Sequence, residues 1–97
     1  MNIGKRIKAV RLSEELSQSQ FCQLVDMSIV SLRNYELEKR TVNEINLTKI
    51  TGHARFDAYA YWLVTGKTLP ESGQVCPAFS IQEQCGIISE EKNSKRA

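Results

Sequence analysis

The chain has 97 residues, of which 41% are apolar and 25% are charged, a balance that is typical of one folded domain and excludes a disordered chain. No apolar run approaches the roughly 20 residues of a membrane span, and no apolar segment follows the basic N-terminal residues as in a secretory signal, so we expect a cytoplasmic protein with no membrane partner. The formal net charge of +2 is too small by itself to indicate nucleic-acid binding. The basic residues nevertheless concentrate in the first two-thirds of the chain, where any attraction to an acidic partner would arise.

Residue types exclude several classes of catalytic and metal site. The three cysteines, Cys22, Cys76 and Cys85, have no C-x-x-C spacing, which argues against a zinc site and against a disulfide framework. His53 is the single histidine, and it stands in the loop-like stretch "TGHAR". Because there is no glycine-rich phosphate loop and no carboxylate pair suited to catalysis, we expect no enzyme activity, no metal and no cofactor.

Apolar spacing and capping residues predict three helices in the first part of the chain. They cover residues 3–15, 18–25 and 29–37. Ser17 with Gln20 has the form of a capping box for the second helix, and Ser28 can cap the third. Asp26 stands in the turn between these two helices, where an aspartate tolerates positive φ.

Two more helices are predicted before Gly66. Thr41 with Glu44 forms another capping-box pattern, which predicts a helix that ends near Gly52. The next helix, over 56–65, is apolar on nearly every side. We therefore expect it to be covered by its own core and also by another subunit.

The composition changes after the fifth predicted helix. Pro70, Gly73 and Pro77 interrupt any regular element, so this segment is interpreted as an arm. The predicted division is a helical domain over 1–66 and a C-terminal arm over 67–97, with disorder at its polar end.

The second and third predicted helices are too short to be stable alone and are joined by a tight turn, which is typical of a helix-turn-helix. In this motif the second member enters the major groove of DNA. With Leu32 and Tyr35 facing the core, helical spacing places six residues on the outer face or its margins: Val30, Arg33, Asn34, Leu37, Ile29 and Ser31. Asparagine bonds adenine edges, arginine bonds guanine edges, and an aliphatic group contacts a thymine methyl, so this face predicts DNA recognition.

Several short stretches support the same prediction. They are "LSQ" at 16–18, Ser28, Leu32, "YE" at 35–36, "KR" at 39–40 and "WLVTG" at 62–66. On these residues, the chain from residue 3 to residue 66 resembles the lambda-repressor and Cro type of helix-turn-helix domain, which is also common among bacterial regulators of the xenobiotic-response-element family. The ending "WLVTGKTLPESGQVCP" is similar to that of small prophage-encoded regulators. The resemblance implies an all-α, five-helix lambda-repressor-like domain with a C-terminal arm.

The resemblance also implies roles for single residues. Gln18 is expected to bond a DNA phosphate and to brace the third helix, at a helix N-terminus that itself attracts phosphate. Arg11 is expected to form a structural ion pair with Glu36. Lys39 and Arg40 match a loop that contacts the DNA backbone. The full expected DNA-binding set is Gln18, Ser28, Ile29, Val30, Ser31, Arg33, Asn34, Lys39 and Arg40.

A homodimer is expected, because one helix-turn-helix contacts few base pairs and two-fold pairing doubles the site. The fifth predicted helix carries more apolar side chains than one small core face is expected to bury, and the arm follows it directly. The expected dimer residues are Phe56, Tyr59, Tyr61, Trp62, Leu69 and Val75.

Three functions compete. The first is a transcriptional regulator, a phage or prophage repressor that binds a double-stranded DNA operator as a homodimer. The second is an antitoxin-like or accessory regulator that holds a partner protein through the fifth helix and the arm. The third is a pure protein-interaction module, which would leave the basic face unused. A mobility shift on the DNA upstream of the chain's own gene, with and without co-purified protein, separates them.

Overall fold

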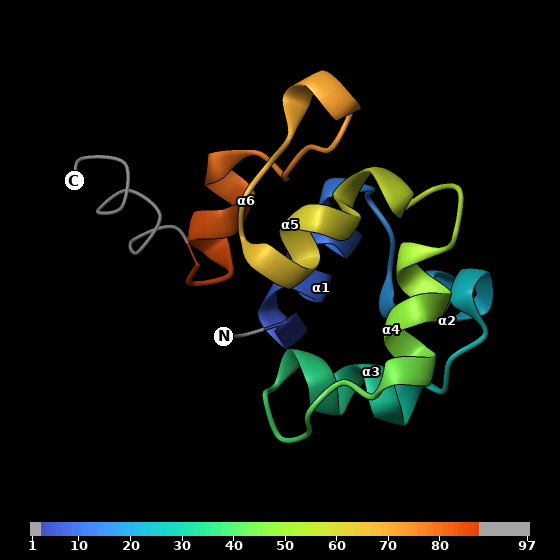
Figure 1. Ribbon diagram of the computed structural model, residues 1–97. Helices are drawn as coiled ribbons and strands as arrows, with labels where there is room; N and C mark the ends of the chain where they lie inside the picture. Colours follow the sequence, from blue (N-terminus) through green and yellow to red (C-terminus); the bar gives the residue numbers. More distant parts are fainter. Residues whose placement is uncertain (1–2, 88–97) are drawn as a thin grey trace.

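The computed structural model describes residues 3–87, and this part of the chain is all-α, as expected (Figure 1). Its elements are α1 (Ile3–Ser13), α2 (Gln18–Val25), α3 (Ile29–Glu36), α4 (Glu44–Thr51), the 3-10 turn η1 (Asp57–Tyr59), α5 (Ala60–Thr65), the 3-10 turn η2 (Pro70–Ser72) and α6 (Phe79–Gln84). Between residues 3 and 87, extended pairing is limited to one isolated antiparallel bridge, from Leu69 to Gln74. No helix in the described range has the length and apolar character needed to cross a membrane. The disorder expected at the polar end of the arm lies outside the described residues.

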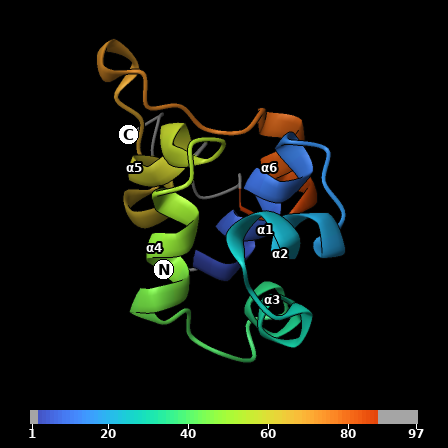
Figure 2. The same ribbon diagram turned by 90° about the vertical axis from the view of Figure 1, so that its right-hand side faces the viewer.

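Helix α1 lies at the centre of the fold and packs against α3, α5 and α6 (Figures 1 and 2). It buries Ile7, Ala9 and Val10 completely. The other buried apolar side chains are Phe21, Cys22, Val25, Met27, Leu32, Tyr35, Ile50, Phe56, Tyr59, Trp62, Leu63 and Cys85. Because every helix except α1 has eight residues or fewer, this shared core and not intrinsic helix propensity holds the elements in place.

Gly4 allows α1 and α3 to approach closely. It is buried, and a Cβ at this position would collide with the backbone carbonyl oxygen of Tyr35. Any larger residue would therefore push the end of α3 away from α1. This contact helps to fix where α3 lies.

Capping side chains set the ends of α2 and α3. The Ser17 hydroxyl accepts from the Gln20 N–H at 3.1 Å, and the Gln20 side chain accepts from the Ser17 N–H at 2.9 Å, which confirms the predicted capping box. Asp26 ends α2 with a φ of 55°, the left-handed conformation expected in the turn. Ser28 then caps α3 by accepting from the Ser31 N–H at 3.0 Å. The predicted caps at Ser17 and Ser28 and the predicted turn residue Asp26 are therefore confirmed.

Two predicted helix boundaries are wrong. Helix α4 is capped by Asn43 and not by Thr41, because the Asn43 side-chain oxygen accepts from the Asn46 N–H at 2.7 Å. The predicted helix over 56–65 is α-helical only from Ala60, because the three residues before it form the tighter turn η1.

The segment after α5, interpreted from the sequence as an arm, is folded onto the helices. The Val75 N–H bonds the Ala58 carbonyl oxygen at 2.9 Å, and α6 packs against α1. Gln82 in α6 is completely buried and donates to the Pro77 carbonyl oxygen at 2.7 Å. Cys85 belongs to the same core cluster as the buried residues of α1. The core of this chain is therefore larger than five helices would provide.

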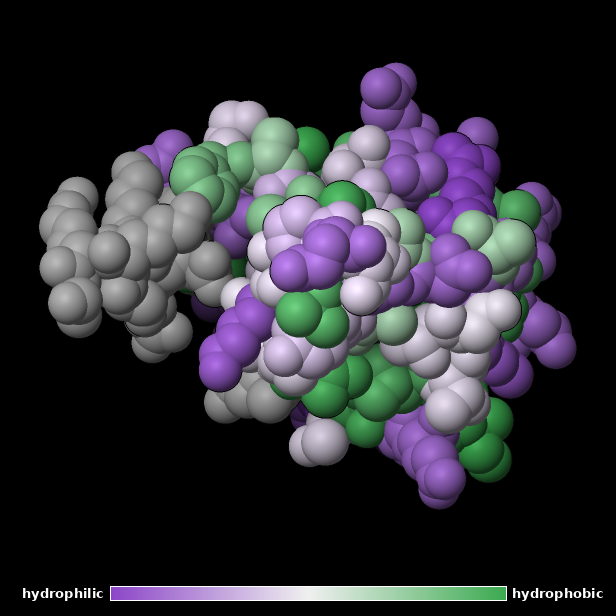
Figure 3. All heavy atoms as spheres, turned by 45° about the horizontal axis from the view of Figure 1, so that its top comes forward, coloured by the Kyte–Doolittle hydropathy of each residue, from purple (hydrophilic) through white to green (hydrophobic). Residues whose placement is uncertain are grey.

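Three residues expected at a dimer interface are instead buried inside the chain. Phe56, Tyr59 and Trp62 are 0%, 8% and 1% exposed. The expectation that the chain's own core could not bury them is wrong, because all three belong to the core cluster, where the Phe56 ring lies against that of Phe21. Leu69 and Val75 are 39% and 43% exposed. Figure 3 shows the side of the molecule from which the hairpin around η2 protrudes, where apolar and polar side chains are mixed.

Candidate nucleic-acid interface

Helix α3 lies at the end of the molecule opposite the hairpin around η2 (Figures 1 and 2). Its inner side chains are fixed in the core, since Leu32 and Tyr35 are 0% and 1% exposed. On its outer side Val30 is 61% exposed, and Arg33 is exposed as well. The helix therefore offers one free face to a partner.

A buried ion pair connects α1 to α3. The Arg11 Nε donates to Glu36 Oε2 at 2.8 Å, and Arg11 Nη2 donates to Glu36 Oε1 at 3.0 Å. The remaining terminal nitrogen of Arg11 donates to the Leu16 carbonyl oxygen at 2.9 Å. Two parallel charge-assisted bonds of this kind are strong and directional, so they fix the orientation of α3 about its own axis.

Gln18, the first residue of α2, continues this network toward the surface. Its Nε2 donates to Glu36 Oε1 at 3.1 Å, and its Oε1 lies 3.5 Å from Arg33 Nε, which is a long contact for a hydrogen bond. The chain of contacts from Arg11 through Glu36 and Gln18 to Arg33 is called the polar network below. This network runs from the buried side of α3 to the Arg33 guanidinium on its exposed side. It therefore favours one orientation of the Arg33 side chain.

The other residues expected to bind DNA differ in how much surface they present. Ser28 and Ser31 share a hydroxyl hydrogen bond of 2.9 Å at the start of α3. Ile29 is half-buried and packs against the core, so it offers less contact area than Val30. Asn34 is half-buried and lies one helical turn after Val30 on the same face.

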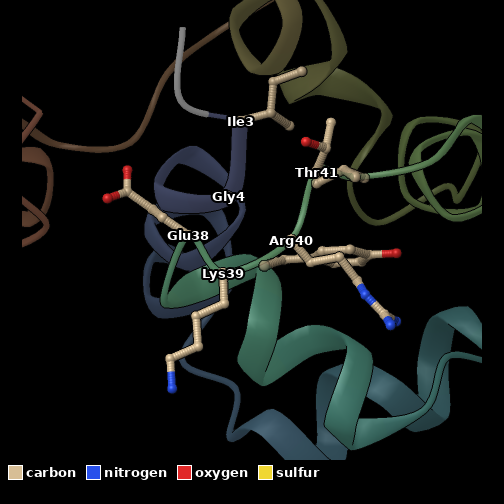
Figure 4. A pocket seen from close by; sticks show the side chains of 8 residues that line it. Ile3, Gly4, Glu38, Lys39, Arg40 and Thr41 are labelled. Atoms are coloured by element: carbon tan, nitrogen blue, oxygen red, sulfur yellow. The ribbon is translucent and has the colours of Figure 1, made fainter.

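Lys39 and Arg40 belong to the loop that follows α3. Glu38 has a φ of 62°, and the Lys39 N–H bonds the Asn34 carbonyl oxygen at 2.8 Å, so the loop starts with a left-handed turn that ends the helix. Both basic side chains are exposed and extend toward the side on which α3 lies (Figure 4). They border an open hollow of about 280 Å³ that is lined by Ile3, Gly4, Tyr35, Glu38, Lys39, Arg40, Thr41 and Val42. The loop thus adds two solvent-facing cations to the end of the molecule that carries α3.

The basic residues of α1 make contacts inside the chain. Lys5 Nζ lies 3.7 Å from a carboxylate oxygen of Glu38. Arg6 donates to the Leu63 carbonyl oxygen at 3.2 Å, and its guanidinium lies 6.0 Å from the centre of the Trp62 ring, within range of a cation–π contact. These two side chains therefore join α1 to the loop after α3 and to α5.

Two contacts that support the interface were not predicted from the sequence. The Lys49 ammonium donates to the Asp26 carbonyl oxygen at 2.7 Å and ties α4 to the turn between α2 and α3. The Asn46 side chain donates to the Tyr35 hydroxyl at 2.7 Å and ties α4 to the end of α3. A lysine in the last turn of a helix suggests only an interaction with its own helix end, so the partner on another element could not be foreseen.

The comparisons with known proteins place this geometry in a family. No protein-family model matches the sequence. The chain is 31% identical to Repressor protein C of Escherichia phage P2 over 78 residues, which are 80% of this chain and 79% of that protein. The chain belongs to this family of phage repressors. The likeness to the lambda-repressor and Cro type stays a prediction from the quoted motifs.

Proposed function

We propose that the chain is a DNA-binding transcriptional repressor of a phage or prophage and that it acts on an operator. The observation that carries this proposal is the free outer face of α3, held by the polar network, with Lys39 and Arg40 beside it. The relative from phage P2 is itself named a repressor protein, which supports the same function. No step of the proposal needs a cofactor or a metal.

Phosphate contacts would come from two places. The first is the N-terminus of α2, where free backbone N–H groups and the partial positive charge of the helix end attract an anion. Gln18 lies at this end, and its amide is within reach of both Glu36 and Arg33. The second is the loop with Lys39 and Arg40, which are exposed and suited to nonspecific attraction to the DNA backbone.

Base contacts would come from the outer face of α3. Arg33 can donate two parallel hydrogen bonds to the major-groove edge of guanine, and Asn34 can both donate to and accept from adenine. The burial of Leu32 and Tyr35 on the opposite side keeps these side chains turned outward. Ser28 and Ser31 would contribute at the start of the helix, where the backbone of α3 comes nearest to DNA in a helix-turn-helix.

The proposal includes a homodimer, formed through the surface around α5 and the hairpin. Tyr61 is half-exposed, and Val64, Leu69 and Val75 are 39%, 39% and 43% exposed. Gln74 joins these residues, because its side chain accepts from the Tyr61 N–H at 2.8 Å and its backbone pairs with Leu69. A second copy is the proposed occupant, because two-fold pairing doubles the number of α3 helices that one assembly offers to DNA.

A mobility shift with the full chain and the DNA upstream of its own gene tests the function. We expect a discrete shift that an excess of unrelated DNA does not abolish. Arg33→Ala should weaken it, whereas Lys67→Ala, which removes an exposed cation of the segment between α5 and η2, should leave it unchanged. A chain that shifts no DNA better than random DNA would contradict the proposal. If a second protein co-purified and was required for the shift, the accessory-regulator function would replace that of an independent repressor.

A further inference from the structure

Val30 is an exposed aliphatic residue in an otherwise polar setting. It is 61% exposed, and its neighbours on the outer side of α3 are the hydroxyl of Ser31, the guanidinium of Arg33 and the amide of Asn34. Its neighbour in the chain, Ile29, packs against the core instead. In the first turn of α3, two similar aliphatic side chains therefore lie in different surroundings. Ile29 packs against the core, whereas Val30 faces the solvent.

The position of Val30 along α3 suggests what it meets. It is the second residue of the helix, two positions after the N-cap Ser28. In a helix-turn-helix the N-terminal residues of the second helix contact the base edges. The major-groove edge of thymine carries a methyl group, and it is the one strongly apolar feature that the four bases present there.

The polar side chains of the face agree with a thymine near Val30. Asn34 lies one turn along the same face, and an asparagine suits adenine, so an A·T pair would place a thymine methyl on the opposite strand within the same short site. Arg33, whose Nε lies 3.5 Å from Gln18 Oε1, stands between Val30 and Asn34 in the chain. Along the outer face of α3 the side chains are thus, in order, the aliphatic group of Val30, the cation of Arg33 and the amide of Asn34.

Leu37 provides an internal comparison. It is 63% exposed, and it stands seven residues after Val30, which is two helical turns along nearly the same face. It caps the C-terminal end of α3, where the backbone turns into the loop of Lys39 and Arg40. Its exposure matches that of Val30, but its end of the helix is the one farther from the bases.

We infer that Val30 contacts the C5 methyl group of a thymine in each operator half-site, and that this contact sets the preference of the chain for thymine at one position. The inference rests on the proposed function, because it assigns a chemical partner to the same face of α3. It adds a specificity-determining residue that acts without a hydrogen bond.

The test removes the methyl group from the DNA and its partner from the protein. A duplex is first selected from a random-sequence library with the full wild-type chain, and each thymine is then replaced singly by uracil, which lacks only that methyl. Affinities are measured for the wild-type chain, for Val30→Ala and for the matched control Leu37→Ala. Retained thermal stability of both variants shows that they are folded.

For the wild-type chain and for Leu37→Ala, we expect uracil at one thymine of each half-site to reduce affinity by about fourfold, the effect of losing one buried methyl group. For Val30→Ala, the same replacement should change affinity by less than about 1.5-fold. An equal loss for Val30→Ala and the wild type, or no sensitive thymine at all, would overturn the inference while leaving DNA binding itself intact. If no duplex were selected, the proposed function would fail and the inference with it.

Discussion

The Arg11 guanidinium donates to both carboxylate oxygens of Glu36, in a pair whose side chains are 9% and 5% exposed. Arg11→Ala would leave that carboxylate buried, with the Gln18 amide as its other observed partner. We expect the free energy of unfolding to fall by about 3 to 5 kcal/mol, because an uncompensated buried charge is costly. Urea denaturation followed by circular dichroism measures this change.

A double variant separates the ion pair from simple loss of packing. Arg11→Met combined with Glu36→Leu removes both charges and keeps apolar volume, so it should recover much of the stability that Arg11→Ala loses. Normal stability of Arg11→Ala together with lost DNA binding would show instead that Arg11 contacts DNA.

If α3 recognises base edges, substitutions on its outer face should weaken binding to the operator more than binding to random DNA. Arg33→Ala and Asn34→Ala should each weaken binding to the operator by about 1 to 3 kcal/mol and leave binding to random DNA nearly unchanged. The measurement is a titration by fluorescence anisotropy on both duplexes. Equal losses on the two duplexes would exclude base contacts by these residues.

If the loop after α3 contacts DNA phosphates, substitutions there should affect binding to every DNA sequence and should also change how the affinity depends on salt. Lys39→Ala or Arg40→Ala should lower affinity for every sequence and reduce the slope of log K against log salt by about one unit. Lys67→Ala is the matched control, because this lysine is exposed but stands between α5 and η2, outside the loop that follows α3. A salt slope that stays at the wild-type value in the loop variants would mean that the loop does not approach the DNA backbone.

The packing of α6 predicts unequal thiol reactivity. Burial raises the pKa of the Cys22 thiol, where the charge of Glu36 adds to the rise, and burial also raises the pKa of the Cys85 thiol. At pH 8 each of these thiols then holds less thiolate than in the unfolded chain, and thiolate is the reactive form. With a thiol-specific reagent we expect the half-exposed Cys76 to react first, and the other two at least about tenfold more slowly.

Denaturant should make all three thiols react at similar rates, and Cys76→Ser should remove only the fast phase. Rapid labelling of Cys85 in the native chain, at the rate of Cys76, would contradict the stable packing of the segment after α5.

The proposed dimer predicts that one charged substitution separates the subunits. Tyr61→Asp should give a monomer that keeps its helical signal but binds the full operator far more weakly, because a carboxylate in an apolar contact is strongly unfavourable. Leu24→Asp changes a side chain on α2 that is 38% exposed and lies outside the proposed dimer surface, so it should leave the oligomeric state unchanged. Sedimentation equilibrium at micromolar concentration measures the oligomeric state of each chain. A wild-type chain that is monomeric and still binds one half-site tightly would contradict the proposed dimer.

Local signals in the sequence predicted the first half of the fold well. The caps at Ser17 and Ser28 and the turn residue Asp26 act through hydrogen bonds and dihedral angles within a few residues of themselves, so spacing alone was enough to find them. The inner face of α3 followed from helical periodicity in the same way.

The second half required information that no local pattern contains. Helix α6 has six residues, no side-chain cap and a buried glutamine, so nothing in its own sequence marks it as part of a core. Its stability comes from packing against α1, which is more than sixty residues earlier in the chain. The burial of Phe56 and Trp62 was misjudged for a related reason, because it depends on partners that are distant in the chain. The Phe56 ring lies against that of Phe21, and the Arg6 guanidinium lies near the Trp62 ring.

Helix α3 keeps its supporting contacts and its free side chains on opposite sides. Gly4 meets its backbone, and Leu32, Tyr35 and Glu36 face inward, whereas Val30 and Arg33 are free of the core. Outer residues can therefore change without disturbing the frame that holds the helix. Related proteins could therefore evolve to recognise new DNA sequences by substitutions at these outer positions alone. Exchanging the same positions in the laboratory could give two such proteins separate target sequences in one cell.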